Sequence, residues 1–304
     1  MKGQLNLFDD LPPPANKPLK FKPAERAIWT ENKAKLIERY LFYFVLITKH
    51  GAYIDGFAGP QYSRRKDAWA AKMVLESKPP FLRNFWLCEL NPKSIEMLKA
   101  LRDAQPPIKN RSIKVVEGDF NANVADLLKT SGIDDSVATF CLLDQRTFEC
   151  EWNTLVTLSK HRSDYKIELF YFLATGWLDR SMKGLKNKSI LEKWWGRSDY
   201  DQLRGMNSFD RMNLFCKRIK EELGYKHAYG WPIYSRERKG RVMYHMIHAT
   251  DHDEAPKIMN RAYRNALKQR EDLRLLQRDL SQLWGSTGSG EKPLPTNPAP
   301  SRPK

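Results

Sequence analysis

The chain has 304 residues, 41 % hydrophobic and 12 % aromatic, which is enough for one α/β domain of ordinary size with helical additions. No apolar run reaches the roughly 20 residues of a membrane-spanning helix, and the N-terminus lacks a secretion-signal pattern, so we expect a cytoplasmic protein without membrane contact. Four scattered cysteines exclude a disulfide framework and a zinc site of recognisable spacing, and a formal net charge of +16 favours an anionic partner, nucleic acid first.

Both ends of the chain have the composition of disordered tails. Residues 1–18 are rich in proline, and residues 285–304 are rich in glycine, serine and proline. Between them we expect a folded domain at 24–263, followed by a basic amphipathic helix at 264–284.

Helical and strand patterns alternate through the expected domain. Apolar residues recur at helical spacing from Ala24 to Lys49, where Gly51 ends the helix. Five short apolar runs indicate buried strands: Ala52–Ile54, Asn84–Cys88, Ile113–Val116, Ala138–Leu143 and Ile167–Leu173. Helical segments follow the second, third and fourth of these: Pro92–Asp103, Asn123–Thr130 and Trp152–Lys160. This alternation predicts a parallel sheet buried on both faces.

The last part of the domain closes the sheet differently. Residues 179–224 have a polar helical pattern, which we expect to form an insertion. Two extended segments, His227–Ser235 and Val242–Ala249, flank a charged turn and predict an antiparallel hairpin. The expected fold is therefore α/β and Rossmann-like, a mostly parallel sheet closed by an antiparallel hairpin, which is the outline of class I methyltransferases.

An acidic residue ends each of the first three strands. Asp55 is followed by the turn Gly56-Phe57-Ala58-Gly59, which is either a plain structural turn or a backbone that a nucleotide-like ligand can approach closely. Glu89 stands where a carboxylate can accept from both hydroxyls of a ribose. Asp119 could accept from an adenine amino group, with Phe120 against the ring. Together these strand ends predict a site for S-adenosylmethionine (SAM).

The fourth strand ends in polar residues that we expect to face a substrate. Asp144 and Gln145 could hydrogen-bond an amine or hydroxyl, Asp144 could act as a base if its pKa were raised, and Arg146 could hold a phosphate. The alternative is ordinary loop chemistry, in which Asp144 caps the loop and Arg146 pairs with Glu149 or Glu151. The sequence favours neither.

The chain resembles the three-Cys-motif partner family, TcmP, whose members have a methyltransferase-like fold. The resemblance covers about Trp29 to Tyr263 and includes Lys33 on the first helix. Its motifs here are Tyr53-Ile54-Asp55-Gly56-Phe57-Ala58-Gly59-Pro60, Tyr244-His245-Met246-Ile247-His248-Ala249-Thr250 and Lys257-Ile258-Met259. It implies a partner, a radical-SAM-like protein with three cysteines.

Two departures from that family bear on chemistry. Gln61 stands where the family usually has glycine, and Leu143-Asp144-Gln145-Arg146 replaces a motif of Ile-Asp-Pro-Phe type. DNA amino-methyltransferases resemble the first motif but carry Asp-Pro-Pro-Tyr on the fourth strand, so this chain departs from them as well.

The segment Gln4–Phe8 resembles the peptide Gln-Leu-x-Leu-Phe by which bacterial DNA-processing proteins bind the replication sliding clamp. Exposed apolar residues in a disordered tail call for a partner surface, and the alternative is a tail that folds back onto its own domain.

Two further patterns need discounting. His245 and His248 point to opposite faces of a strand and are not expected to share a metal ion. Trp194 and Trp195, with basic neighbours, are either core residues, which we favour, or a surface that stacks bases.

Two main hypotheses follow. The first is a SAM-dependent methyltransferase that acts on or near nucleic acid. The second is a non-catalytic accessory subunit or adaptor, and a weaker third is a nuclease-like enzyme that uses Asp144, Glu149 and Glu151 around Mg²⁺.

Overall fold

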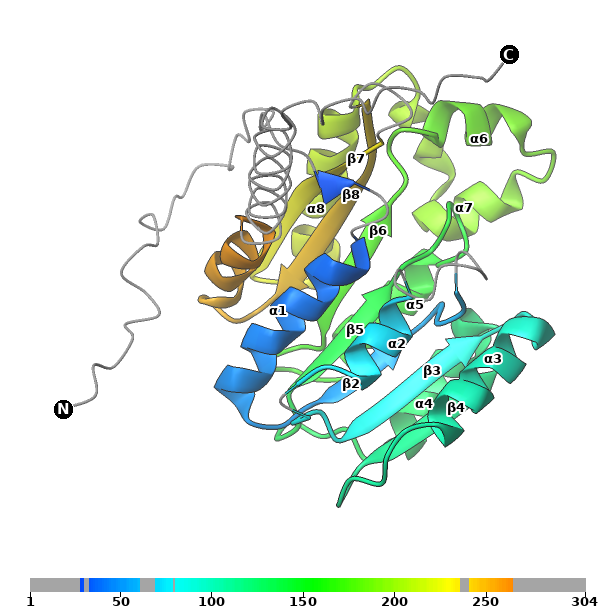
Figure 1. The fold of residues 1–304 in the computed structure, drawn as a ribbon. Coiled ribbons are helices and arrows are strands. Elements are labelled where there is room, and N and C mark those ends of the chain that lie inside the picture. Colours follow the sequence, from blue (N-terminus) through cyan, green and yellow to red (C-terminus); the bar gives the residue numbers. More distant parts are fainter. Residues whose placement is uncertain (1–27, 30–32, 61–68, 79, 236–240, 265–304) are drawn as a thin grey trace, which may run out of the picture. The chain divides into compact units, whose positions relative to one another are not determined.

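The computed structural model describes residues 28–29, 33–60, 69–78, 80–235 and 241–264 (Figure 1). The described strands form one eight-stranded sheet in the order β1-β7-β8-β6-β5-β2-β3-β4. They are β1 Ile28–Trp29, β2 Ala52–Asp55, β3 Asn84–Glu89, β4 Ser112–Glu117, β5 Thr139–Leu143, β6 Glu168–Leu173, β7 His227–Ser235 and β8 Arg241–Thr250. Strands β2 to β6 are parallel, and β8 is antiparallel to both β6 and β7. The fold is α/β and Rossmann-like, closed by a hairpin, as expected.

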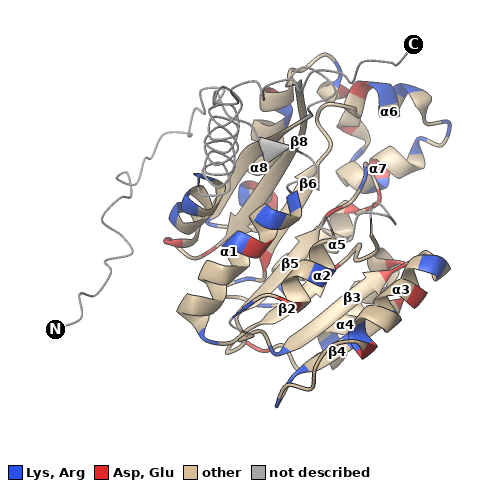
Figure 2. Cartoon of the chain, in the orientation of Figure 1, with Lys and Arg blue, Asp and Glu red and all other residues tan. Residues whose placement is uncertain are grey.

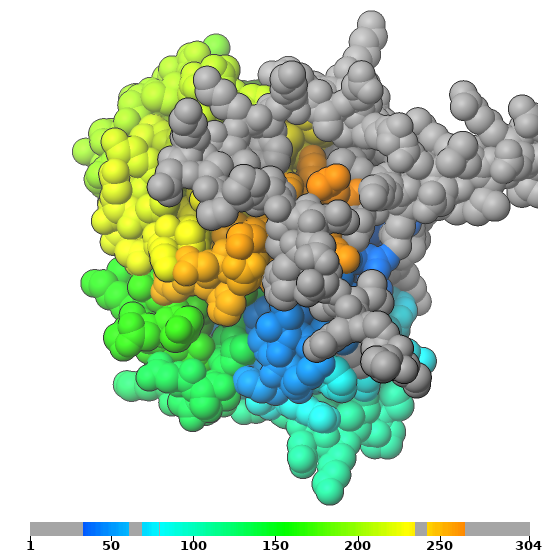
Figure 3. Space-filling model, turned by 90° about the vertical axis from the view of Figure 1, so that its left-hand side faces the viewer, coloured from blue at the N-terminus to red at the C-terminus, as the bar shows by residue number. Residues whose placement is uncertain are grey.

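Helices cover both faces of this sheet. They are α1 Lys33–Thr48, α2 Ala70–Leu75, α3 Pro92–Asp103, α4 Phe120–Thr130, α5 Trp152–Lys160, α6 Leu178–Gly184, α7 Ser189–Trp195, the 3-10 helix η3 Ser198–Leu203 and α8 Ser208–Leu223. Helices α1 and α2 lie on one face, and α4, α5 and α8 on the other (Figure 1). Residues 255–264 are also helical, and the last part of the described chain, in orange, lies against α1, in blue (Figure 3).

Alternation along the strands divides the core into two layers. On one face, the rings of Phe140 and Phe170 lie 4.5 Å apart and Tyr40 of α1 packs on Phe170 at 4.8 Å. On the other, the Tyr171 ring stacks on Phe215 of α8 at 4.9 Å. Since neighbouring residues of a strand point to opposite faces, both layers come from the same apolar runs.

Most expected elements are confirmed, but the first helix is shorter than predicted. It begins at Lys33 instead of Ala24, because Ile28–Trp29 pair as a parallel edge strand with Ile233–Tyr234 of β7. The hairpin and the helical nature of 179–224 are confirmed. The two expected tails, the segment that contains Gln61, and the basic helix beyond 264 lie outside the described residues.

Within the part of the chain that the structure describes, no helix combines the length and apolar character needed to cross a membrane.

Candidate functional site

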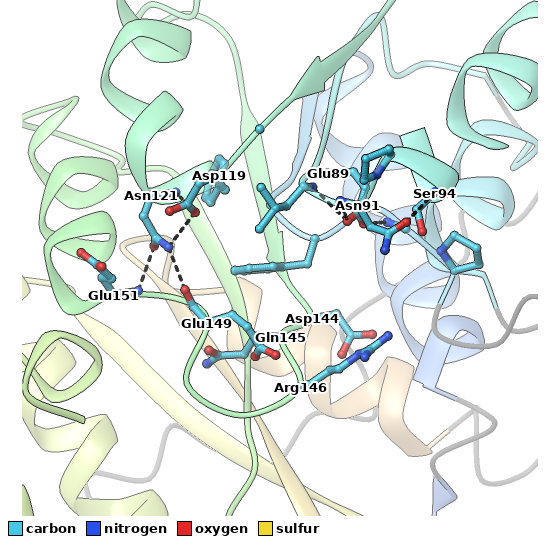
Figure 4. A pocket seen from close by; sticks show the side chains of 18 residues that line it. Glu89, Asn91, Ser94, Asp119, Asn121, Asp144, Gln145, Arg146, Glu149 and Glu151 are labelled. Carbon is cyan, nitrogen blue, oxygen red and sulfur yellow. Dashed lines mark hydrogen bonds between the residues drawn. The ribbon is translucent and has the colours of Figure 1, made fainter. Parts of the chain in front are cut away.

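A cavity of about 670 Å³ opens at the carboxyl ends of β2, β3, β4 and β5 (Figure 4). Loops that follow these four strands supply its walls. They contribute Gly56, Phe57, Gly59 and Pro60 after β2, Glu89 to Pro92 and Ser94 after β3, Gly118 to Asn121 after β4, and Asp144, Gln145, Arg146, Glu149 and Glu151 after β5. The cavity thus lies at the sheet edge where an open α/β fold binds its ligand.

Two of the residues predicted to bind a cofactor do not line this cavity. Asp55 is only 1 % exposed, because its carboxylate accepts from the Tyr53 hydroxyl at 2.9 Å and from the Phe57 backbone N–H at 3.2 Å. Burial raises the pKa of Asp55 to about 7, against the lowering effect of these two hydrogen bonds. Ala58 is 2 % exposed. Asp55 therefore holds the first loop from behind instead of touching a ligand.

The two glycines of the first loop make room for the protein's own side chains. A Cβ at Gly56 would lie 2.7 Å from the Phe120 ring, and a Cβ at Gly59 would overlap the Glu89 carboxylate. The glycines therefore let Phe120 and Glu89 approach the loop. Both glycines also line the cavity, and close approach of a ligand to this backbone stays a prediction.

Glu89 is tied to the backbone on both sides of the cavity. Its Oε2 accepts from the Gly59 N–H at 2.8 Å, and its Oε1 accepts from the N–H groups of Leu90 at 2.9 Å and Asn91 at 2.8 Å. A carboxylate has about four lone-pair sites, so about one remains for a ligand. Both hydroxyls of a ribose diol could be accepted only if a backbone bond gave way.

Asp119 directly precedes α4 and lies at the exposed side of the cavity. Its carboxylate accepts from the backbone N–H of Asn121 at 3.0 Å, as the N-cap of the helix. Phe120, predicted to meet an adenine ring, is 2 % exposed and packs edge-on against Phe57 at 6.2 Å. Phe120 therefore lies at the floor of the cavity, with little of its ring open to stack on a base.

Asp144 pairs with Lys33, the first residue of α1, which lies 111 residues earlier in the sequence. The Lys33 ammonium lies 2.6 Å from Asp144 Oδ1, with the two side chains only 5 % and 12 % exposed. The same ammonium lies 4.5 Å from the ring centre of Phe172 and 4.7 Å from that of Tyr244. The Asp144 carboxylate is thus held in an ion pair with α1 and is not free for acid–base chemistry, and neither sequence alternative described this partner.

Gln145 and Arg146 differ sharply in exposure. Gln145 is 1 % exposed, and its side-chain oxygen accepts from the Cys150 N–H at 2.8 Å, so it holds the loop together. Its side-chain nitrogen is buried without a hydrogen-bond partner and the residue lines the cavity, so its predicted contact with a substrate stays a prediction. Arg146 is exposed and lines the cavity, and it has no ion-pair partner among the described residues, unlike the predicted alternative. Glu151 pairs with Lys193 instead, at 3.2 Å.

Three residues that shape the site were not assigned a role from sequence. Leu90 is 67 % exposed at the cavity, a large apolar side chain directly after the acidic residue of its strand. Asn121 joins two loops: its amide nitrogen donates to Asp119 and to the Glu149 carbonyl at 2.8 Å, and its oxygen accepts from the Glu151 N–H at 2.9 Å. The third, Lys33, was noticed only as part of the family resemblance.

The cavity is acidic although the chain is basic. Its walls hold five carboxylates against the single guanidinium of Arg146: Glu89, Asp119, Asp144, Glu149 and Glu151. Lys33 and Lys193 neutralise two of the five. The remaining charge favours a cationic ligand and disfavours the pyrophosphate of a dinucleotide.

Among the described residues, no group of three acidic, histidine or cysteine side chains is placed to hold a metal ion. His245 contacts Phe209 of α8 and His248 contacts Tyr40 of α1, on opposite faces of the sheet. Asp144 and Glu151 are engaged by lysines. The nuclease-like arrangement therefore has no support in this geometry.

Comparison with family models and with curated proteins found no match for this chain. Among solved structures, it is similar to a Legionella pneumophila str. Philadelphia 1 protein of the DUF519 family, with 10 % identity and a TM-score of 0.43. That likeness covers 77 % of this chain and 91 % of the other. At this TM-score it adds nothing to the assignment of the fold, which rests on the strand order and pairing.

Proposed function

We propose that the protein binds SAM in the cavity at the carboxyl ends of β2 to β5 and transfers its methyl group to nucleic acid. The observation that carries the proposal is an acid-lined cavity at this edge of a sheet that ends in an antiparallel hairpin. SAM carries a sulfonium and an ammonium group, and carboxylate walls attract both positive charges. The same walls repel the negative phosphates of a nucleotide.

The residues present fit such a ligand. The volume of about 670 Å³ lies within the range of roughly 300–1,000 Å³ that small-molecule sites occupy. The Glu89 carboxylate has a lone pair left for a ribose hydroxyl, and the exposed Leu90 side chain offers an apolar surface for a base. When bound, SAM would supply a methyl group from its sulfonium to a nucleophilic atom and leave as S-adenosylhomocysteine.

A second function has a specific observation in its favour. Asp144 is paired with Lys33, and the side-chain oxygen of Gln145 accepts from its own loop, so the end of β5 presents little acid–base chemistry. A non-catalytic accessory subunit would need no acid–base chemistry at this position, whether it binds SAM or no cofactor at all. The resemblance to the TcmP family would then make its partner a radical-SAM-like protein with three cysteines.

Calorimetric titration with SAM and S-adenosylhomocysteine tests cofactor binding directly. We expect micromolar binding to the wild type, weakened about 10- to 100-fold in Glu89→Gln, because one hydrogen bond to a charged group contributes about 1.5–3 kcal/mol. Glu221→Gln, on an exposed turn of α8, is the matched control and should bind as the wild type does.

Transfer of a radiolabelled methyl group to DNA or RNA then separates the two functions. Label in the nucleic acid would support the methyltransferase. Saturable SAM binding with no transfer to any nucleic acid, together with a stable complex with a three-cysteine protein, would favour the accessory role. No binding to the wild type would refute the proposed cofactor.

A further inference from the structure

The helical insertion leaves the sheet beside the cavity and returns to it. Strand β6, from which it starts, pairs with β5 through Leu143 and Tyr171, so both strands end at the same edge. Helix α7 comes back to the cavity wall, where the Trp194 ring packs on Phe148 at 4.9 Å and Lys193 pairs with Glu151. The insertion therefore lies against the cavity wall at Glu151.

Besides Lys188 and Lys220, three exposed cations on this insertion form no ion pair with a carboxylate of the described structure. They are Arg180, Lys183 and Lys186. The nearby Asp179 is engaged by the buried Arg211, whose Nη2 lies 2.5 Å from its carboxylate. Figure 2 shows basic residues along α6 in blue. Arg180 and Lys183, three apart, share one face of α6.

Lys188 does not belong to this group, because its ammonium donates to the Met182 carbonyl at 3.2 Å. The two tryptophans of α7 do not belong to it either. Trp194 and Trp195 are 1 % and 0 % exposed, which confirms the prediction that they are core residues. Bases cannot stack on these buried rings. The surface of the insertion therefore offers a nucleic acid positive charge, not aromatic rings.

From this placement we infer that the insertion is the surface that holds nucleic acid, with Arg180, Lys183 and Lys186 on the phosphate backbone. Arg146, exposed at the cavity and without an ion-pair partner among the described residues, holds the phosphate next to the nucleotide that enters the acidic pocket. The inference rests on the proposed function, since it names the surface that presents the substrate to the same site.

The charges of the two regions support separate roles, with the insertion binding phosphates and the cavity binding a base and the cofactor. Unpaired cations bind phosphates by releasing counterions, independently of base sequence. The acidic cavity repels phosphate and accepts only a neutral base or a cationic cofactor. A strand that runs over the insertion would thus be kept outside the cavity except for the base it offers.

Fluorescence anisotropy with a labelled single strand longer than about 16 nucleotides, the upper site size of single-strand binders, and with a duplex of equal length tests the surface. The variant is Arg180→Gln/Lys183→Gln/Lys186→Gln. Its matched control is Lys109→Gln/Lys129→Gln/Lys160→Gln, three exposed lysines at the opposite edge of the sheet. Both triple variants remove three positive charges.

In the insertion variant we expect affinity at low salt to fall about 10-fold or more, and the slope of log K against log salt to become less steep by about 2–3. The control variant should bind as the wild type does. Equal binding by both variants, or equal losses in both, would overturn the inference.

Arg146→Gln tests the same surface without a change in the insertion, and its salt slope should become less steep by about one. An unchanged slope would remove Arg146 from the surface. Calorimetry with SAM keeps the two proposals apart. If the wild type binds no SAM while the insertion variant still loses nucleic acid, the cofactor fails and the surface stands.

Discussion

The Asp55 carboxyl group lies behind the wall of the cavity, and its burial has a consequence for stability. Its pKa in the folded chain is raised to about 7, whereas in the unfolded chain it ionises near pH 4. Between these values the unfolded state binds fewer protons than the folded state, so the free energy of unfolding falls as pH rises towards about 7. This carboxyl group therefore stabilises the fold most below about pH 4 and least above about pH 7.

Asp55→Asn should remove that dependence. The amide oxygen can still accept from the Phe57 N–H, and the amide nitrogen can donate to the Tyr53 hydroxyl. Relative to wild type, the variant should gain unfolding free energy as pH rises from about 4 to 7, by ~1.4 kcal/mol for each pKa unit of the shift. Urea unfolding across this range measures the gain. Asp126→Asn, exposed on α4, is the control, and a pH-independent difference for Asp55→Asn would contradict the prediction.

The buried ion pair between Lys33 and Asp144 also contributes to stability. Removal of one partner leaves a charge in a site where the side chains are 5 % and 12 % exposed, so Lys33→Met and Asp144→Asn should each cost about 3–5 kcal/mol of unfolding free energy. The double variant should lose clearly less than the sum, because it leaves no unpaired charge.

Denaturant unfolding of the four proteins gives the coupling between the two side chains. Additive losses would show that the pair contributes no mutual stabilisation. Methyl transfer in the Asp144→Asn variant has to be read beside these values, since a loss of activity that follows the loss of stability is no sign of a catalytic carboxylate.

The sequence predicted which residues reach the site but not where their side chains point. The acidic strand ends were visible because each follows an apolar run. Their directions were not, since Asp55 is turned inward by Tyr53 two residues earlier, and Asp144 is held by a lysine 111 residues away. Short-range patterns predict which residues reach an edge of the sheet, whereas long-range partners decide which of them meet a ligand.

At the scale of the elements, the loop after β2 and the end of β3 form one unit. Gly59→Ala should break it, because a Cβ there would overlap Glu89 and lie 2.9 Å from Ser94 Cβ. We expect a stability loss of about 1–3 kcal/mol from overpacking and weaker SAM binding, measured by thermal unfolding and calorimetry.

Gly184→Ala is the matched substitution, since a Cβ at that position meets nothing within 4 Å. It should leave SAM binding unchanged. If Gly59→Ala binds SAM as well as Gly184→Ala does, the contact between Gly59 and Glu89 is not part of the binding site.

The elements also show where sequence patterns stop. Strands β2 to β6 were predictable, because each is a continuous apolar run between turns. The two-residue strand β1 was not, since Trp29 fits the helical spacing of the segment that follows, and only its pairing with Tyr234 of β7, far along the chain, makes it a strand. Edge pairing of this kind leaves no local signal.

For the whole molecule, the described chain divides its tasks between regions. The cavity is acidic and lies at one edge of the sheet, the unpaired cations lie on the insertion beside it, and the two aromatic layers hold the sheet between them. Among the described residues, those that line the cavity all lie between Gly56 and Glu151. Functions carried by the ends of the chain should therefore be separable from cofactor binding.

The segment Gln4–Phe8, outside the described residues, allows that separation to be tested. Deletion of Met1 to Asp10, or the pair Leu7→Ser/Phe8→Ser, should abolish retention of the full chain on an immobilised bacterial sliding clamp, because the apolar side chains of the peptide are lost. Leu11→Ser, an apolar position beyond the motif, should be retained. SAM binding should be equal in all of these proteins, since none of the changes alters a described residue that lines the cavity. Unchanged retention after the deletion would show that this segment does not bind the clamp.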